Sequence, residues 1–276
     1  MTISHFALMD TIRWRIVFVL IAFALVDSMV AIFAYSTNSS GTDLRTKITD
    51  AEVMVTQGIA AIIGVIVAIR HGTDGLHGKT YTSLSIGLVL WFMGEITWTV
   101  YEAVLQVDMP SFSLADVFWI LGYGFFGFHL FRMYIYFARV INRKAIAGTS
   151  IAVGIVIAYL IYQMAIVADF SSIDSILTFA SRTSYAVGDA VLILPALLLL
   201  WTLRKAKLHF SPWFFISISL LTTAAADSIF SFVSLQYDGG NEWISNLLYD
   251  SANVCMAGGL YWYNRFVIMD TSKVEK

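Results

Sequence analysis

Seven acidic residues lie within long apolar stretches of this chain, where a carboxylate is costly unless it has a partner. They are Asp27, Glu95, Glu102, Asp116, Asp189, Asp227 and Asp250. A carboxylate at the bilayer centre costs about 2.5–3.5 kcal/mol on insertion scales, so seven facing lipid would cost on the order of 20 kcal/mol. We therefore expect them to face one another, water or a bound cation. Carboxylates that share such a space titrate as a group, which makes this layer sensitive to pH or to cations.

The composition places these acids in a membrane. The chain is 58% hydrophobic and only 13% charged, whereas soluble domains have about 25% charged residues. A net charge of −2 without a basic run excludes a nucleic-acid partner. The single cysteine, Cys255, excludes an intramolecular disulfide framework and CxxC-type metal or redox sites. The sequence requires no cofactor and leaves open whether a metal is bound.

The apolar runs predict an all-α membrane protein with eight transmembrane helices. These are about residues 13–35, 51–70, 82–106, 114–138, 149–168, 183–203, 212–236 and 243–266. Each has roughly the 20 residues that a span requires. The first run is too long for a signal peptide and lacks a cleavage site, so we expect the mature protein to retain it. Because the connections are short, residues 1–276 form a single polytopic transmembrane domain.

Lysine and arginine predict the orientation. Thirteen of them fall on the side of the N-terminus, Arg132 lies within the fourth span, and only Arg45, Lys47 and the edge residue Arg182 fall on the opposite side. By the positive-inside rule both termini are cytoplasmic, and the seven acids lie in the outer half of the bilayer. We expect this bilayer to be the plasma membrane. The outer loops are acidic as well. This negative charge either serves to raise the local concentration of cations, or it is only a consequence of the bias that keeps lysine and arginine out of the outer loops.

The third predicted span has the clearest pattern of chemical groups on one helix face. Trp91, Glu95, Trp98 and Glu102 follow i, i+4, i+7, i+11 spacing, so two carboxylates and two indoles share a face. Trp98 lies away from the membrane interfaces and predicts an aromatic wall. The two glutamates either bind a ligand or bond to hydroxyl groups and hold helices together.

Later spans add two further groups. Asp116 follows Ser113 at the start of the fourth span, where it either joins the binding set or stabilises the helix N-terminus. Arg182, Tyr185 and Asp189 have spacings that place them on one face of the sixth span. Arg182 is the only base near the acids and is expected to neutralise one of them.

The acids also suggest an internal duplication. A shift of 132 residues places Glu95 on Asp227 and Gln57 on Asp189, and a gap of two residues then places Asp116 on Asp250. The halves, residues 1–145 and 146–276, would each hold four spans in the same orientation, as a 4+4 parallel repeat. Few identities besides these polar positions support it, so a chance alignment stays open.

The segment from Pro110 to Tyr123, with Leu114-Ala115-Asp116 at its centre, resembles a family of multi-spanning membrane sensory regions. Tyr185 to Asp189, Ala226-Asp227 and Tyr249-Asp250 are similar to later acidic positions of that family. Such regions precede diguanylate cyclase or histidine kinase domains in bacteria and archaea. The resemblance implies a sensory role in the membrane. The chain ends about ten residues after its last predicted span, so we expect it to signal through another chain.

The sequence favours a non-enzymatic function. Gly188-Asp189 and Tyr249-Asp250 are similar to fragments of intramembrane aspartyl proteases, but their order differs and Ala186 replaces the first glycine. No residue is therefore assigned a catalytic role. The leading hypothesis is a protein that binds or senses a cation or small polar ligand. Its binding set is Glu95, Glu102, Asp116, Asp189, Asp227, Asp250, Arg182 and Trp98. It would act as a homo-oligomer or as a subunit of a larger complex. The alternatives are a proton- or cation-coupled transporter and a structural accessory subunit.

Overall fold

The computed structural model is all-helical over the residues that it describes. These are residues 41–105, 107, 112–137, 143–168, 170–205, 212–236 and 242–268, together with residues 22, 26 and 29. The predicted first span, residues 13–35, and Asp27 within it therefore lie outside the described residues.

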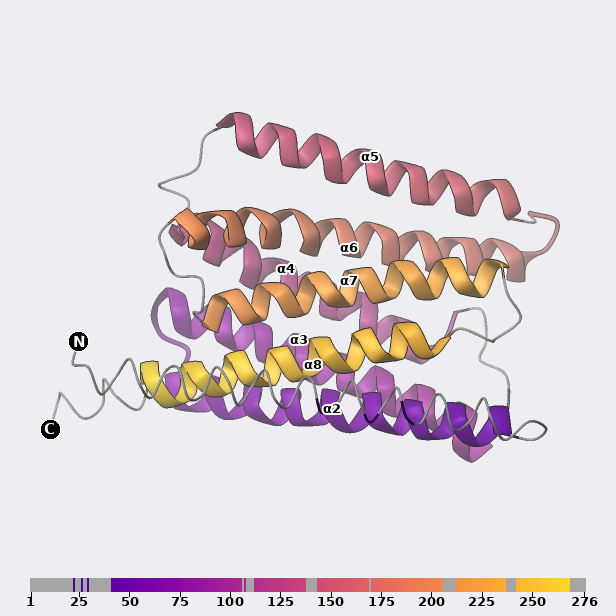
Figure 1. The fold of residues 1–276 in the computed structure, drawn as a ribbon, viewed down its shortest axis with the longest axis horizontal. Coiled ribbons are helices and arrows are strands. Elements are labelled where there is room, and N and C mark those ends of the chain that lie inside the picture. The colour runs from indigo at the N-terminus through magenta and orange to yellow at the C-terminus, as the bar shows by residue number, and fades with distance from the viewer. Residues whose placement is uncertain are drawn as a thin grey trace, which may run out of the picture.

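Seven α-helices and two π-helical segments make up the described chain. They are α2 (Gly41–His71), α3 (Gly75–Thr99), η1 (Val100–Leu105), α4 (Leu114–Phe137), α5 (Arg143–Val167), α6 (Ile173–Lys205), α7 (Pro212–Gln236), α8 (Glu242–Trp262) and η3 (Tyr263–Ile268). Long apolar runs form helices in lipid because a helix satisfies its own backbone hydrogen bonds. Figure 1 shows the helices lying side by side with similar directions in space.

Six of these helices are long and apolar enough to cross a membrane, so the protein is a multi-pass integral membrane protein. The six candidate spans are Asp50–His71, Gly75–Glu102, Leu114–Tyr136, Ile146–Ile166, Ile173–Arg204 and Pro212–Phe230. They coincide with the second to seventh spans that the sequence predicts. The eighth predicted span forms α8 and η3, which pack in the same bundle but are not among the six.

The helices form a closed ring of six. Neighbours along the ring are α2 and α3, α3 and α4, α4 and α6, α6 and α7, α7 and α8, and finally α8 and α2. α5 packs against α6 and lies at the edge of the bundle, as Figure 1 shows. Apolar side chains on the outside of the ring and on α5, such as Ile62, Phe131 and Ile155, are exposed. In a membrane protein such side chains face lipid.

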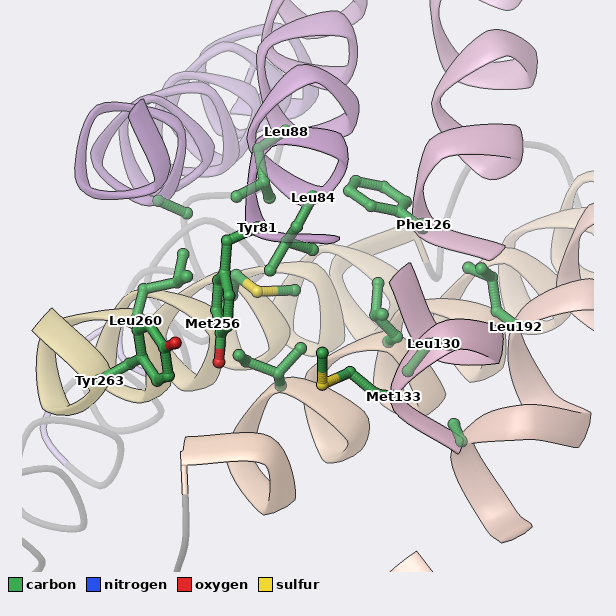
Figure 2. Packing of buried hydrophobic residues seen from close by; sticks show 14 of the residues in the cluster. Tyr81, Leu84, Leu88, Phe126, Leu130, Met133, Leu192, Met256, Leu260 and Tyr263 are labelled. Carbon is green, nitrogen blue, oxygen red and sulfur yellow. The ribbon is translucent and has the colours of Figure 1, made fainter. Parts of the chain in front are cut away.

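The ring encloses an apolar core that holds α3, α4, α6 and α8 together. Figure 2 shows Tyr81, Leu84, Phe126, Leu192 and Met256 converging from these helices. Close approach of α3 and α4 depends on glycine. A Cβ on Gly87 would lie only 2.5 Å from the ring of Phe126. The two helices are therefore held in a fixed register beside the acidic residues.

Candidate functional site

Two aspartates from neighbouring helices meet in the middle of the bundle. Asp189 of α6 is buried, and Asp227 of α7 is half-buried. Their carboxyl groups lie close enough to act on each other as like charges. An ionised carboxylate can only accept hydrogen bonds, so two ionised carboxylates in this position repel each other.

Tyr123 of α4 touches both members of this pair. Its hydroxyl lies 2.5 Å from Oδ2 of Asp227 and 3.1 Å from Oδ1 of Asp189. A phenol has one hydrogen to donate. If Tyr123 donates it to the closer Asp227, then a hydrogen bond to Asp189 requires Asp189 to carry a proton and donate. The geometry is therefore that of two carboxyl groups and a phenol that share protons.

A second phenol completes the coordination of Asp227. Tyr249 of α8 donates to Oδ1 of Asp227 at 2.5 Å, so each oxygen of this carboxyl group contacts one tyrosine hydroxyl. The pair thus joins α4, α6, α7 and α8 through side chains alone. We call Asp189, Asp227, Tyr123 and Tyr249 the carboxyl–tyrosine cluster.

Glu95 of α3 lies beside this cluster. Its Oε1 accepts a hydrogen bond of 3.2 Å from the indole of Trp119, and its charge interacts with those of Asp227 and Asp250. Trp98 lies next to Trp119, with ring centroids 5.9 Å apart, and next to Phe230 of α7 at 6.4 Å. The indole of Trp98 therefore lies among aromatic rings from α4 and α7.

Asp116 has a different environment, in which every contact comes from a donor. Its Oδ2 accepts from the amide and the hydroxyl of Ser113 at 2.7 and 2.6 Å. Its own amide donates back to Ser113 Oγ at 3.3 Å, which makes a reciprocal cap at the start of α4. Its Oδ1 accepts from Ser181 at 2.9 Å and from Tyr185 at 2.7 Å, both on α6. This carboxylate caps α4 and fastens it to α6.

Asp250 joins α8 to α2. Its Oδ1 contacts the hydroxyl of Thr56 at 2.7 Å, and Asn253 donates to the same hydroxyl oxygen at 3.2 Å. All three side chains are buried. Thr56 also lies 3.0 Å from the carbonyl of Val53. The arrangement is a buried polar link between helices that are far apart in sequence.

The remaining predicted site residues lie apart from these contacts. Glu102 falls in η1, half-buried, and its Oε2 has no hydrogen-bond partner among the described residues. Arg182 is half-buried, and the described residues show no ion pair between it and a carboxylate. The face of α6 that meets Asp116 presents Ser181 and Tyr185 instead, because one residue along a helix turns the side chain by about 100°.

Several partners were not in the predicted set, although the sequence holds a signal for some of them. Three of these partners are aromatic residues that carry a polar group and lie within apolar spans, away from the lysines and arginines that mark the span ends. They are Tyr123, Tyr249 and Trp119. Such a polar group needs a hydrogen-bond partner in a membrane interior. Ser181 and Thr56 give no such signal, since a hydroxyl group in a helix commonly bonds to its own backbone.

Neither a search for metal-binding groups nor a comparison with known proteins assigns a ligand to these residues. Among the described residues, no group of three or more histidine, cysteine, aspartate or glutamate side chains could hold a metal ion. No family model, curated protein or solved structure matches the chain.

Proposed function

We propose that this protein is a multi-pass protein of the plasma membrane that binds and senses a cation at the carboxyl–tyrosine cluster. Of the cations and small polar ligands that an acidic layer suits, the geometry favours the proton. The observation that carries this proposal is the hydroxyl of Tyr123, which contacts both Asp227 and Asp189 with a single hydrogen. Two carboxyl groups in contact share a proton because both cannot ionise at that distance without strong repulsion.

The groups that face the pair from each neighbouring helix support a proton site. α4 contributes the hydroxyl of Tyr123, α8 that of Tyr249, and α3 the carboxyl group of Glu95. The charge of Asp189 also acts on both tyrosines. On α5, which packs against α6, Tyr159 and Tyr162 are exposed. The negative charge of Glu95 disfavours two ionised carboxylates and so supports a shared proton, while the donors on Tyr123 and Tyr249 stabilise the one carboxylate that stays ionised.

Loss of the proton would change how the helices are held. The cluster joins α4, α6, α7 and α8, so repulsion between Asp189 and Asp227 acts directly on the ring. A shift in helix packing is the kind of output that a membrane sensory region passes to a partner chain. The resemblance at Leu114-Ala115-Asp116 supports such a role, with a homo-oligomer or a separate signalling subunit as the receiver. We expect the cluster to lie in the outer half of the membrane, with both termini cytoplasmic.

The order of helix contacts supports a repeated architecture. α2, α3 and α4 pack in succession, as do α6, α7 and α8, and the contacts of α4 with α6 and of α8 with α2 close the ring. Asp116 and Asp250 each accept a hydroxyl group across one of these two closing contacts. Both features are expected of two parallel halves related by an axis along the membrane normal.

Infrared difference spectroscopy of the purified protein across a pH titration tests the proton site. A protonated carboxyl group has a carbonyl band that disappears on ionisation. The D189N and D227N variants should each remove this titrating band, while D74N, a change at the exposed Asp74, should retain it. A titration that is the same in all three variants would contradict the proposal.

A proton-coupled transporter is the alternative that one observation favours. The buried His129 lies on α4 nearer its C-terminal end than Tyr123, and its Nδ1 lies 3.0 Å from the carbonyl of Thr80. A carbonyl only accepts, so Nδ1 carries the hydrogen and Nε2 is the basic nitrogen when the ring is neutral. Proton flux into proteoliposomes that depends on Asp189 and His129 would support transport and overturn a purely sensory role.

The contacts disfavour two other functions for the cluster. In an aspartic hydrolase two carboxyl groups hold a water molecule, but here both oxygens of Asp227 contact tyrosine hydroxyls. A purely structural role fits Asp116 and Asp250, whose contacts are hydroxyl and amide groups that link helices. It fits Asp189 and Asp227 less well, because two like-charged groups in contact are a poor way to join helices.

A further inference from the structure

Two histidines face the short turn between α2 and α3, at the end of the bundle opposite to Asp116. His71 is the last residue of α2, and His77 lies in the first turn of α3. The turn has two glycines with left-handed backbone conformation, Gly72 at φ 75° and Gly75 at φ 68°. A Cβ on Gly78 would lie only 2.6 Å from the carbonyl oxygen of Gly72. The turn is therefore folded tightly against the start of α3.

Aromatic packing fixes both imidazole rings. His71 stacks on Tyr81 and on Tyr263, with ring centroids 6.3 and 5.9 Å apart. His77 meets the ring of Tyr136 edge-on at 5.0 Å. The centroids of the two imidazoles themselves are 6.2 Å apart. Residues from α3, α4 and η3 thus hold two potential metal ligands close together.

One ring nitrogen of each histidine lacks a hydrogen-bond partner among the described residues. Nδ1 of His71 and Nδ1 of His77 are both buried, and neither has a hydrogen bond within the described part of the chain. A buried polar atom without a partner is unfavourable, so a missing ligand is a physical explanation for the pair. One cation held between two neutral imidazoles satisfies both nitrogens.

We propose that His71 and His77 form a two-histidine site for one first-row transition-metal ion that prefers imidazole, such as copper or zinc. Neutral imidazole nitrogen is a common ligand of both metals, and Cu²⁺ binds most tightly of the divalent series. The histidines are half-buried, so water completes the coordination and the ion can enter. The exposed carboxylate of Asp74 adds negative charge to the turn. The site is remote from the carboxyl–tyrosine cluster and does not depend on its role.

The test uses the full-length protein, purified in detergent without a histidine tag. The protein is incubated with Cu²⁺ alone or with Zn²⁺ alone, in competition with a chelator, and bound metal is measured after gel filtration. We expect one ion per chain. H71N and H77N should each weaken binding by about 100-fold, because even residues that only support a ligand contribute about 10–100-fold. H209N, at a histidine outside the described residues, is the matched control and should bind as the unmodified protein does.

Electron paramagnetic resonance of the Cu²⁺-loaded protein gives a readout that does not depend on the variants folding. Nitrogen hyperfine structure from two imidazoles is expected. Failure to retain an ion would overturn the proposal. So would retention of the ion by the H71N/H77N double variant, or a spectrum with no nitrogen ligand.

Discussion

Gly188 lies directly against the ring of Tyr123. A Cβ at Gly188 would come within 2.7 Å of Cγ and within 2.8 Å of both Cδ atoms of that ring. These are the atoms nearest the tyrosine backbone, so the side chain cannot move aside by a simple swing of its tip. The glycine next to Asp189 is what allows the hydroxyl of Tyr123 to reach both Asp189 and Asp227.

The G188A variant should therefore displace Tyr123 and uncouple the two carboxyl groups. We expect a loss of about 1–3 kcal/mol of stability from overpacking, measured by thermal unfolding in detergent, together with a changed carboxyl titration in the infrared spectrum. Gly124 provides the control, since a Cβ there would meet nothing within 4 Å. G124A should leave stability and titration unchanged. A normal titration in G188A would show that the position of Tyr123 does not matter.

Stability should depend on pH through Asp189 and Asp227. In the proposed site the folded protein shares a proton between these two carboxyl groups, whereas two separated, solvated carboxyl groups release it at neutral pH. Where the folded state binds more protons than the unfolded state, stability falls as the pH rises. We expect a loss of about 1–3 kcal/mol between about pH 5 and about pH 9, because ionisation of both groups sets two negative charges against each other.

The D189N and D227N variants should flatten this pH dependence, since an amide cannot ionise. The measurement is the unfolding temperature of each variant across the pH series. The exposed Asp74 serves as the comparison, and D74N should retain the slope of the unmodified protein. Parallel slopes in all of these proteins would mean that the pair carries no functional proton.

Asp116 should behave as a structural residue with no part in the proton site. Its two carboxyl oxygens accept from the Ser113 amide and hydroxyl and from the hydroxyls of Ser181 and Tyr185. D116N replaces one acceptor oxygen by an NH₂ group that meets donors. Hydrogen bonds to charged groups contribute about 1.5–3 kcal/mol each, so we expect a loss of about that size in unfolding experiments.

The infrared titration distinguishes this role from a binding role. In D116N the band of the carboxyl–tyrosine cluster should titrate as in the unmodified protein. S113A, which removes only the cap hydroxyl, should cost about 1 kcal/mol. If D116N removed the titrating band, Asp116 would belong to the proton site after all.

The fold could be predicted from the sequence largely because lipid imposes a simple rule. Any uninterrupted apolar run of sufficient length becomes a helix, and the second to seventh predicted spans coincide with the six candidate spans. The ends of the helices are predicted less accurately than their positions along the chain. α6 begins at Ile173, ten residues before the predicted 183, because its first turns are polar and a hydropathy pattern does not detect a polar helix.

The grouping of the acids could be predicted only in part. That carboxyl groups gather between the third, fourth, sixth, seventh and eighth spans follows from the cost of burying them singly. Which ones touch depends on the order of helices in the ring, and no local pattern encodes that order. The Asp189–Asp227 contact and the Tyr123 hydroxyl between them arise because α4, α6 and α7 are neighbours. Arg182 is the clearest example of this limit. The sequence pattern predicts that Arg182 neutralises an acidic residue, whereas the adjacent Ser181 makes the contact with Asp116.

The buried link between α2 and α8 should be sensitive to the loss of one hydroxyl group. T56V keeps the shape of the side chain but leaves Asp250 and Asn253 without the hydroxyl that both contact. A buried polar group that loses its partner costs about 1–3 kcal/mol, so the unfolding temperature should fall accordingly. T56S, which retains the hydroxyl, should keep most of the stability that T56V loses. T222V is the matched control, because the hydroxyl of Thr222 bonds to the carbonyl of Ile218 in its own helix and, within the described part of the chain, to no other helix. Equal effects of T56V and T222V would show that the contact with Asp250 adds nothing to the closure of the ring.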